Sequence, residues 1–238
     1  MTTHPQISPD EPGFKELQQH PTFYIHGADL TFVSGNILFR VHRYFFDRES
    51  RVFREQVLPT SGATSKEGYT DATAISIDVP ADDFAQLLGI FYNPTYSLYD
   101  LSISDWTCVL ALAHNWEFNE VKNLAVRELQ KQDLGVVERI ALYQTYKVDA
   151  QFLVPLYAIL CSRDEPPNDE EADALGSKTA IRVYRARERL RAQSPDGGRS
   201  PLPEGIGLSQ VYDTLSAMFG MASPVSSPIE DKAGELNG

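Results

Sequence analysis

The chain has 238 residues, 42% of them hydrophobic and 11% aromatic, so it can hold one sizeable domain with a tail or two small domains, each with a packed core. Its formal net charge of −12 repels phosphate backbones and anionic lipid headgroups, which disfavours nucleic acid and membranes as partners. The two cysteines lie in apolar helical patterns and indicate no disulfide framework. With no secretory leader pattern and no run of about 18 apolar residues, we expect a soluble intracellular protein of the cytoplasm or nucleus.

Composition divides the chain into a polar lead, a patterned middle and a mixed tail. We expect residues 1–20 to be a mobile N-terminal lead because they contain few core-forming side chains. Regular apolar patterns run through residues 21–163. Residues 164–238 are expected to be a partly disordered tail with candidate helices at 170–193 and 208–219.

The first patterned stretch, residues 30–42, consists of two alternating apolar runs. Between them lie Ser34, Gly35 and Asn36, which are turn formers. Turn formers between alternating runs predict a β-hairpin. Residues 75–79 alternate in the same way and predict a half-buried strand.

The apolar period changes to that of helices from Pro80 onward. Pro80 suits the first turn of one helix, and Ser104 is predicted to cap the next. Further helical patterns follow as far as residue 163. The helical spacing predicts four core residues, which are Phe84, Leu88, Trp106 and Leu110.

This order, with short strands first and helices afterwards, indicates an α+β fold in which a small sheet is covered by helical hairpins. An aspartate opens the first strand, Phe-x-x-His ends the hairpin, an arginine follows, and Ser-x-x-Phe ends the next helix. The residues at these positions are Asp29, Phe39, His42, Arg43, Ser50 and Phe53. Together with the order of the later elements, this pattern over residues 23–132 resembles a BTB (POZ) domain. The sequence as a whole, including the helical patterns that continue past residue 132, is similar to stand-alone fungal BTB proteins.

The resemblance implies a BTB/POZ-like domain over residues 21–132, followed by a helical extension over 133–163 and extra C-terminal helices. It implies a non-enzymatic protein–protein interaction module that forms homodimers or hetero-associations. The candidate roles are presentation of partners to a cullin-3 ubiquitin ligase, as an adaptor, and transcriptional regulation. In place of the family's usual aliphatic start, the first helix begins with three aromatic residues.

These aromatic residues, Tyr44, Phe45 and Phe46, cannot all be buried, because a helix does not place three consecutive side chains on one face. We expect one to point outward, either as a partner-binding surface or as a partly exposed side chain without a role. The resemblance also implies that Asp29 and Arg43 form a charged pocket near a dimer interface. The candidate partner-binding site therefore consists of Asp29, Arg43, Tyr44 and Phe45.

No pattern in the sequence indicates catalysis, a cofactor or a metal. A glycine-rich phosphate loop is missing, and Cys108 and His114 would lie about 120° apart around a helix. We expect His42 to be a structural histidine packed beneath the charged pair. An enzyme on an unfamiliar α+β scaffold is the alternative, and it would need a pocket with converging titratable groups.

The tail contains a run of five arginines, which are Arg182, Arg185, Arg187, Arg189 and Arg191. Such a run is typical of a nuclear-import signal or a nucleic-acid contact, and also of a solvated helix face. The acidic total charge favours the solvated face. Further on, residues 208–219 have helical apolar spacing, which predicts an amphipathic helix that docks on the domain or on a partner.

Overall fold

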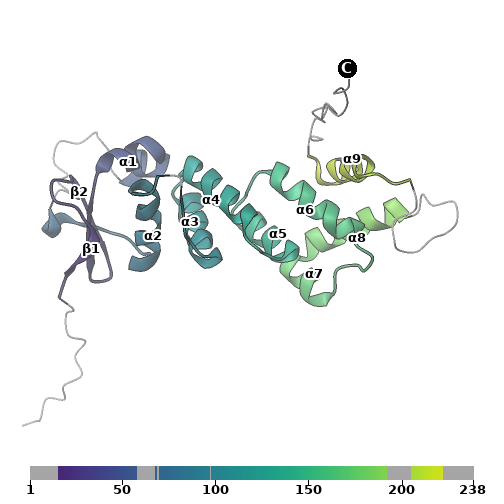
Figure 1. The fold of residues 1–238 in the computed structure, drawn as a ribbon, viewed down its shortest axis with the longest axis horizontal. Coiled ribbons are helices and arrows are strands. Elements are labelled where there is room, and N and C mark those ends of the chain that lie inside the picture. The colour runs from purple at the N-terminus through teal and green to yellow at the C-terminus, as the bar shows by residue number, and fades with distance from the viewer. Residues whose placement is uncertain (1–15, 58–67, 69, 97, 192–204, 222–238) are drawn as a thin grey trace, which may run out of the picture. The chain divides into compact units, whose positions relative to one another are not determined.

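The structure is a computed structural model, and it describes residues 16–57, 68, 70–96, 98–191 and 205–221 (Figure 1). The chain divides into two compact units. Unit 1 comprises residues 1–132 and unit 2 comprises residues 133–238. In the described residues, the strands belong to unit 1 and unit 2 is helical.

Unit 1 contains a four-stranded sheet of β1 (Gln18–Tyr24), β2 (Leu30–Ser34), β3 (Ile37–Val41) and β4 (Ile75–Ser76). Its strand order is β1-β3-β2-β4. The antiparallel pair of β2 and β3 is the predicted hairpin, and Gly35 has the positive φ of 58° that its turn needs. The predicted strand over residues 75–79 is only two residues long as β4, although the N–H of Ile77 still donates to the carbonyl of Val33 at 2.9 Å and the carbonyl of Val79 accepts from the Ser34 hydroxyl.

Strand β1 begins at Gln18, so the prediction of a mobile lead over residues 1–20 is wrong for residues 18–20. It runs parallel to β3 at one edge of the sheet. Pro21 lies inside it, which an edge strand tolerates because its outer N–H groups need no partner strand. Residues 1–15 lie outside the described residues.

His20 holds an irregularity in the pairing of β1 with β3. Its Nδ1 accepts hydrogen bonds from the backbone N–H groups of Thr22 at 3.2 Å and Phe23 at 3.0 Å. Its ring stacks on Phe39, with 4.8 Å between the ring centroids. Burial lowers the pKa of His20, and Asp82 opposes this shift, so the neutral imidazole that can accept hydrogen bonds is favoured.

The helices of unit 1 are α1 (Arg43–Glu49), α2 (Ala81–Phe91), α3 (Ile103–Asn115) and α4 (Asn119–Lys131), with short helical turns η1 (Phe53–Val57) and η2 (Asp71–Thr73). Consecutive helices α2, α3 and α4 pack against one another. All four predicted core residues are buried, which confirms the helical faces: Phe84, Leu88, Trp106 and Leu110. The predicted α+β class is confirmed.

Helix α3 begins two residues earlier than predicted, because Ser102 and not Ser104 is its N-cap. The Ser102 hydroxyl accepts from the Asp105 N–H at 3.2 Å, and the Asp105 carboxylate accepts from the Ser102 N–H at 3.1 Å. This reciprocal pair is a capping box. Ser104 has Thr107 three positions later, which does not provide the acidic partner.

Unit 2 contains α5 (Val136–Thr145), α6 (Ala150–Ser162), α7 (Asp169–Leu175), α8 (Ser177–Arg191) and α9 (Leu208–Phe219). Helix α6 packs against α5, α8 and α9, so residues 133–163 share one core with helices of the tail. The candidate helix at 170–193 is two helices, α7 and α8, because Gly176 adopts a φ of 75° between them. The tail beyond Arg191 is described only at residues 205–221, so its expected partial disorder lies outside the described residues.

Candidate protein-interaction surface

Helix α1 follows the hairpin directly, and its first free N–H group is satisfied from another part of the chain. The backbone N–H of Arg43 donates to Oδ1 of Asp29 at 2.9 Å, while the N-cap residue, His42, makes no side-chain cap. Asp29 therefore caps α1 and places a negative charge at the positive end of its dipole. Asp29 and Arg43 do meet, but this contact uses the backbone of Arg43, whose guanidinium pairs with Asp47 at 2.9 Å.

His42 is exposed, so the expectation that it packs beneath the charged pair is wrong. The chain turns into α1 at this residue, which leaves its ring at the surface. Its backbone N–H donates to the Tyr92 hydroxyl at 2.8 Å, and its Nδ1 lies 3.0 Å from the same oxygen. Burial raises the pKa of Tyr92, so this hydroxyl stays protonated and ties the start of α1 to the end of α2.

The remaining residues of the family pattern serve the fold. Phe39 is fully buried, with its ring centroid 5.0 Å from that of Phe84. The Ser50 hydroxyl donates to the carbonyl of Trp116 and accepts from the N–H of Phe53 at 3.1 Å. These contacts join the end of α1 to the segment between α3 and α4.

The three aromatic residues of α1 separate as the helix geometry requires. Phe46 is buried, Phe45 is half-buried with its ring stacked 5.4 Å from that of Phe91, and Tyr44 is 61% exposed. The Arg48 guanidinium lies 5.0 Å from the centroid of the Tyr44 ring, and its Nη1 donates to the Tyr44 hydroxyl at 3.2 Å. Tyr44 is therefore the outward-facing residue, and Arg48 holds its orientation.

A groove of about 210 Å³ lies next to these residues, between α1, α2 and α4. Its apolar lining comes from Phe45, Ile90, Phe91, Val121 and Leu124, and its charged lining from Arg48, Glu49 and Glu120. This volume is below the range of about 300–1,000 Å³ that is usual for small-molecule sites. It suits one apolar side chain of a partner. We call Tyr44, Phe45, Arg48 and this groove the α1 surface.

A second exposed apolar group, which the sequence did not indicate, lies after the end of α2. Tyr96 is 86% exposed and Leu98 is 74% exposed. The Asn93 side-chain amide donates to the carbonyl of Leu98 at 3.0 Å, and Tyr96 has a positive φ of 58°. This loop presents two large apolar side chains to solvent from a well-bonded turn.

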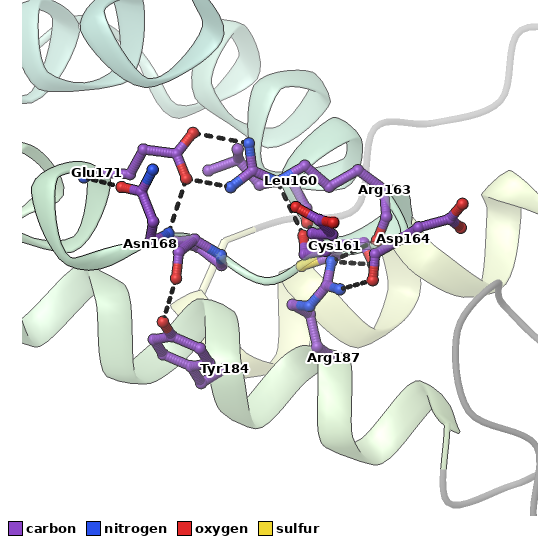
Figure 2. Close-up of polar contacts among 10 residues, drawn as sticks. Leu160, Cys161, Arg163, Asp164, Asn168, Glu171, Tyr184 and Arg187 are labelled. Carbon is purple, nitrogen blue, oxygen red and sulfur yellow. Dashed lines mark hydrogen bonds and ion pairs between the residues drawn. The ribbon is translucent and has the colours of Figure 1, made fainter.

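The arginine run in α8 does not form a uniform solvated face. Figure 2 shows the guanidinium of Arg187 below the end of α6, where Nη1 donates to the carbonyls of Leu160 at 2.6 Å and Cys161 at 3.1 Å. Arg187 is only 3% exposed, so the solvated interpretation is wrong for this residue. Arg182 lies 5.5 Å from the Phe219 ring, whereas Arg185 and Arg189 are exposed.

The described residues contain no group of three or more His, Cys, Asp or Glu side chains that could hold a metal ion. Burial raises the pKa of the Cys161 thiol to about 11, which keeps it protonated and a poor nucleophile. Burial also raises the pKa of Cys108. Among the helices described, none is both long and apolar enough to cross a membrane.

Unit 1 is therefore an α+β domain in which a small sheet is combined with consecutive helices, and one aromatic side chain of its first helix, Tyr44, is exposed. The family model for the BTB/POZ domain matches residues 15–133, and the chain belongs to this family. BTB/POZ domains are protein–protein interaction modules of a non-enzymatic fold. A search of the curated proteins and a search of the solved structures each found no match.

Proposed function

We propose that this chain is a non-enzymatic adaptor that associates with a second copy of itself, or with another protein, through the α1 surface. One observation carries the proposal: Tyr44 is exposed, and Arg48 holds it in one orientation beside an apolar groove. Tyrosine and arginine are enriched among the residues that dominate interface energies. An aromatic side chain that is already held in place loses less conformational entropy on binding.

The same surface carries both a protruding ring and a groove, which suits association between identical copies. In a twofold dimer each copy uses the same surface, so Tyr44 of one copy fits the groove of the other and the reverse also holds. The Phe45 and Phe91 rings form an apolar floor for the incoming ring. Charged residues at the edge, Arg48 and Glu49, then form a polar rim.

Sedimentation velocity across a concentration series tests this proposal. Tyr44→Ser is expected to weaken self-association by about 1,000-fold, because the twofold dimer loses two interface aromatics and each loss costs about 2 kcal/mol or more. Tyr96→Ser is the matched control, since it removes a tyrosine that is even more exposed, 86% against 61%, from a loop of unit 1 outside the α1 surface. A wild-type chain that stays monomeric throughout, or equal weakening by both variants, would argue against homotypic association through α1.

Cullin-3 is the heterotypic partner that membership of the BTB/POZ family raises. The loop with Tyr96 and Leu98 supports a second binding surface for such a partner, because both side chains are exposed without packing that would explain their apolar character. Capture of purified cullin-3 by the wild-type chain, with loss of capture in Tyr96→Ser and retention in Tyr44→Ser, is the expected result. Failure of the wild-type chain to capture cullin-3 would remove this partner.

A nuclear regulator that uses the arginine run is the alternative to the adaptor. The contacts of Arg187 and Arg182 within unit 2 weaken it, because they leave fewer arginines available to an import receptor or to nucleic acid. Its test is nuclear retention of a variant in which Arg185 and Arg189 are replaced by Ser. Unchanged localisation in this variant is expected.

A further inference from the structure

Helix α9 lies against α6 and α8 through one apolar line. Val211 and Leu215 are fully buried there. Phe219 stacks on Tyr157, with 4.4 Å between the ring centroids and 14° between the ring planes, and Arg182 lies 5.5 Å from the Phe219 ring. The spacing of i, i+4 and i+8 places all three α9 side chains on one helical face. Helix α9 thus presents two aliphatic residues and then an aromatic residue on one face, and we call the surface of α6 and α8 that it covers the groove.

The attachment of α9 differs from that of the other helices of unit 2. Residues 192–207 separate it from α8, and these 16 residues are rich in Pro, Gly and Ser. A stretch of this length reaches at most roughly 55 Å when extended. Helix α9 itself has 12 residues, and an isolated helix of that length is marginally stable in water. The helical conformation of α9 therefore depends on its contact with the groove.

The fit of α9 in the groove includes an unfavourable element. Ser216 is 5% exposed, and its hydroxyl has no hydrogen-bond partner among the described residues. A buried hydroxyl without a partner weakens docking, because it loses its hydrogen bonds to water. At the start of the helix, Leu208 is 63% exposed and adds little to the contact. Alanine at position 216 would dock better, so α9 is bound more weakly than its apolar line allows.

We propose that the groove between α6 and α8 is a docking site for an amphipathic helix of a partner protein, and that α9 is its displaceable intramolecular occupant. The partner helix carries aliphatic residues at the positions of Val211 and Leu215 and an aromatic residue at that of Phe219. Near Arg182 it carries no basic residue. The groove belongs to unit 2 and the α1 surface belongs to unit 1, so this proposal and the proposed function can be tested independently.

Effective concentration determines how strongly α9 competes with a partner. A helix joined to its binding site by a linker of this length has an effective concentration on the order of millimolar. A free α9 peptide that binds the empty groove with a dissociation constant of about 10–100 μM would, once tethered, make any partner helix bind the closed chain about 10- to 100-fold more weakly. Displacement becomes favourable for a helix that fits the groove better than α9, for example one without the buried hydroxyl.

The test uses the full chain and a fluorescent peptide with the sequence of residues 205–221 as the probe. Leu215→Asp in the full chain removes α9 from the groove, and fluorescence anisotropy then measures binding of the peptide. We expect the peptide to bind the Leu215→Asp chain at least 10-fold more tightly than the wild-type chain. A peptide with Ser216→Ala should bind about 10-fold more tightly than the unmodified peptide, and one with Phe219→Ala should lose binding. Ala217→Ser, at an exposed position, is the matched control and should change nothing.

Three results would overturn the proposal. The first is a Leu215→Asp chain that is unfolded by circular dichroism, because an essential core helix is not displaceable. The second is equal binding of the peptide to both chains, or binding to neither. The third is self-association that Leu215→Asp abolishes and Tyr44→Ser preserves, which would assign the groove to α9 of a second copy.

Discussion

Replacement of Arg187 by Met is the sharpest test of how unit 2 is held together. The guanidinium donates to the carbonyls of Leu160, Cys161, Arg163 and Asp164, at distances of 2.6 to 3.1 Å (Figure 2). The last carbonyls of a helix have no partner within the helix, and Arg187 supplies one at the end of α6. It also places a positive charge at the negative end of the α6 dipole.

The expected magnitude is a difference between opposing effects. Hydrogen bonds from a charged donor contribute about 1.5–3 kcal/mol each, and a cation at a helix C-terminus contributes up to about 2 kcal/mol. The desolvation of the guanidinium opposes these contributions and costs several kcal/mol. The same desolvation lowers the pKa of Arg187. We therefore expect Arg187→Met to lower the unfolding free energy of unit 2 by about 3 kcal/mol, because buried carbonyls are left without donors.

Hydrogen exchange read by mass spectrometry resolves this effect. Protection should fall in α6 and α8 and stay unchanged in the sheet of unit 1. Both tryptophans lie in unit 1, so tryptophan fluorescence during urea unfolding provides an internal control. Arg185→Met, an exposed change on the same helix, should alter the unfolding free energy by less than about 0.5 kcal/mol. A similarly small effect of Arg187→Met would refute the reasoning.

Three further predictions concern unit 1. Leu88→Ala should cost about 2–5 kcal/mol of unfolding free energy in urea melts, and a loss below about 0.5 kcal/mol would show that its burial contributes little. Asp29→Ala should lower the unfolding free energy by about 0.5–2 kcal/mol, because α1 loses its cap. The double variant Asp29→Arg, Arg43→Glu should restore none of this stability, because the Asp29 carboxylate accepts from the backbone N–H of residue 43. Recovery of stability in the double variant, in the same urea melts, would indicate a side-chain pair. The pKa of His20 in the folded chain lies below its ordinary value of 6.5, so the unfolded state binds the proton more readily. The stabilisation of β1 by neutral His20 is therefore present above pH 6.5 and is lost as the pH falls from 6.5 through the folded pKa. The protection factors of the β1 amides, which are corrected for the intrinsic pH dependence of exchange, should therefore fall over this interval in the wild-type chain but not in His20→Phe, and unchanged protection factors in the wild type would count against this prediction.

The candidate site was predictable only in part. The arrangement of Tyr44, Phe45 and Phe46 requires that one ring points outward, because successive helical residues lie about 100° apart. Which ring does so depends on where α2 and α4 pack, and that information lies far away along the chain. The groove beside Phe45 combines three helices and has no local sequence signal. The partner-binding role of these residues stays a prediction.

Local patterns determined much of this protein without any structure. Alternation around Gly35 predicts the hairpin, helical spacing predicts the burial of Leu88 and Trp106, and the order of elements indicates the α+β class. These features succeed because side-chain periodicity follows directly from backbone geometry over a few residues.

Tertiary structure decided the features that depend on distant partners. Strand β1 forms because β3 offers it a parallel edge, although its own residues lack alternation and include Pro21. Arg187 resembles its exposed neighbours in sequence, yet it is buried because the carbonyl end of α6 lies opposite it. A buried polar group requires a hydrogen-bond partner, and the residue that supplies it is brought near only by folding.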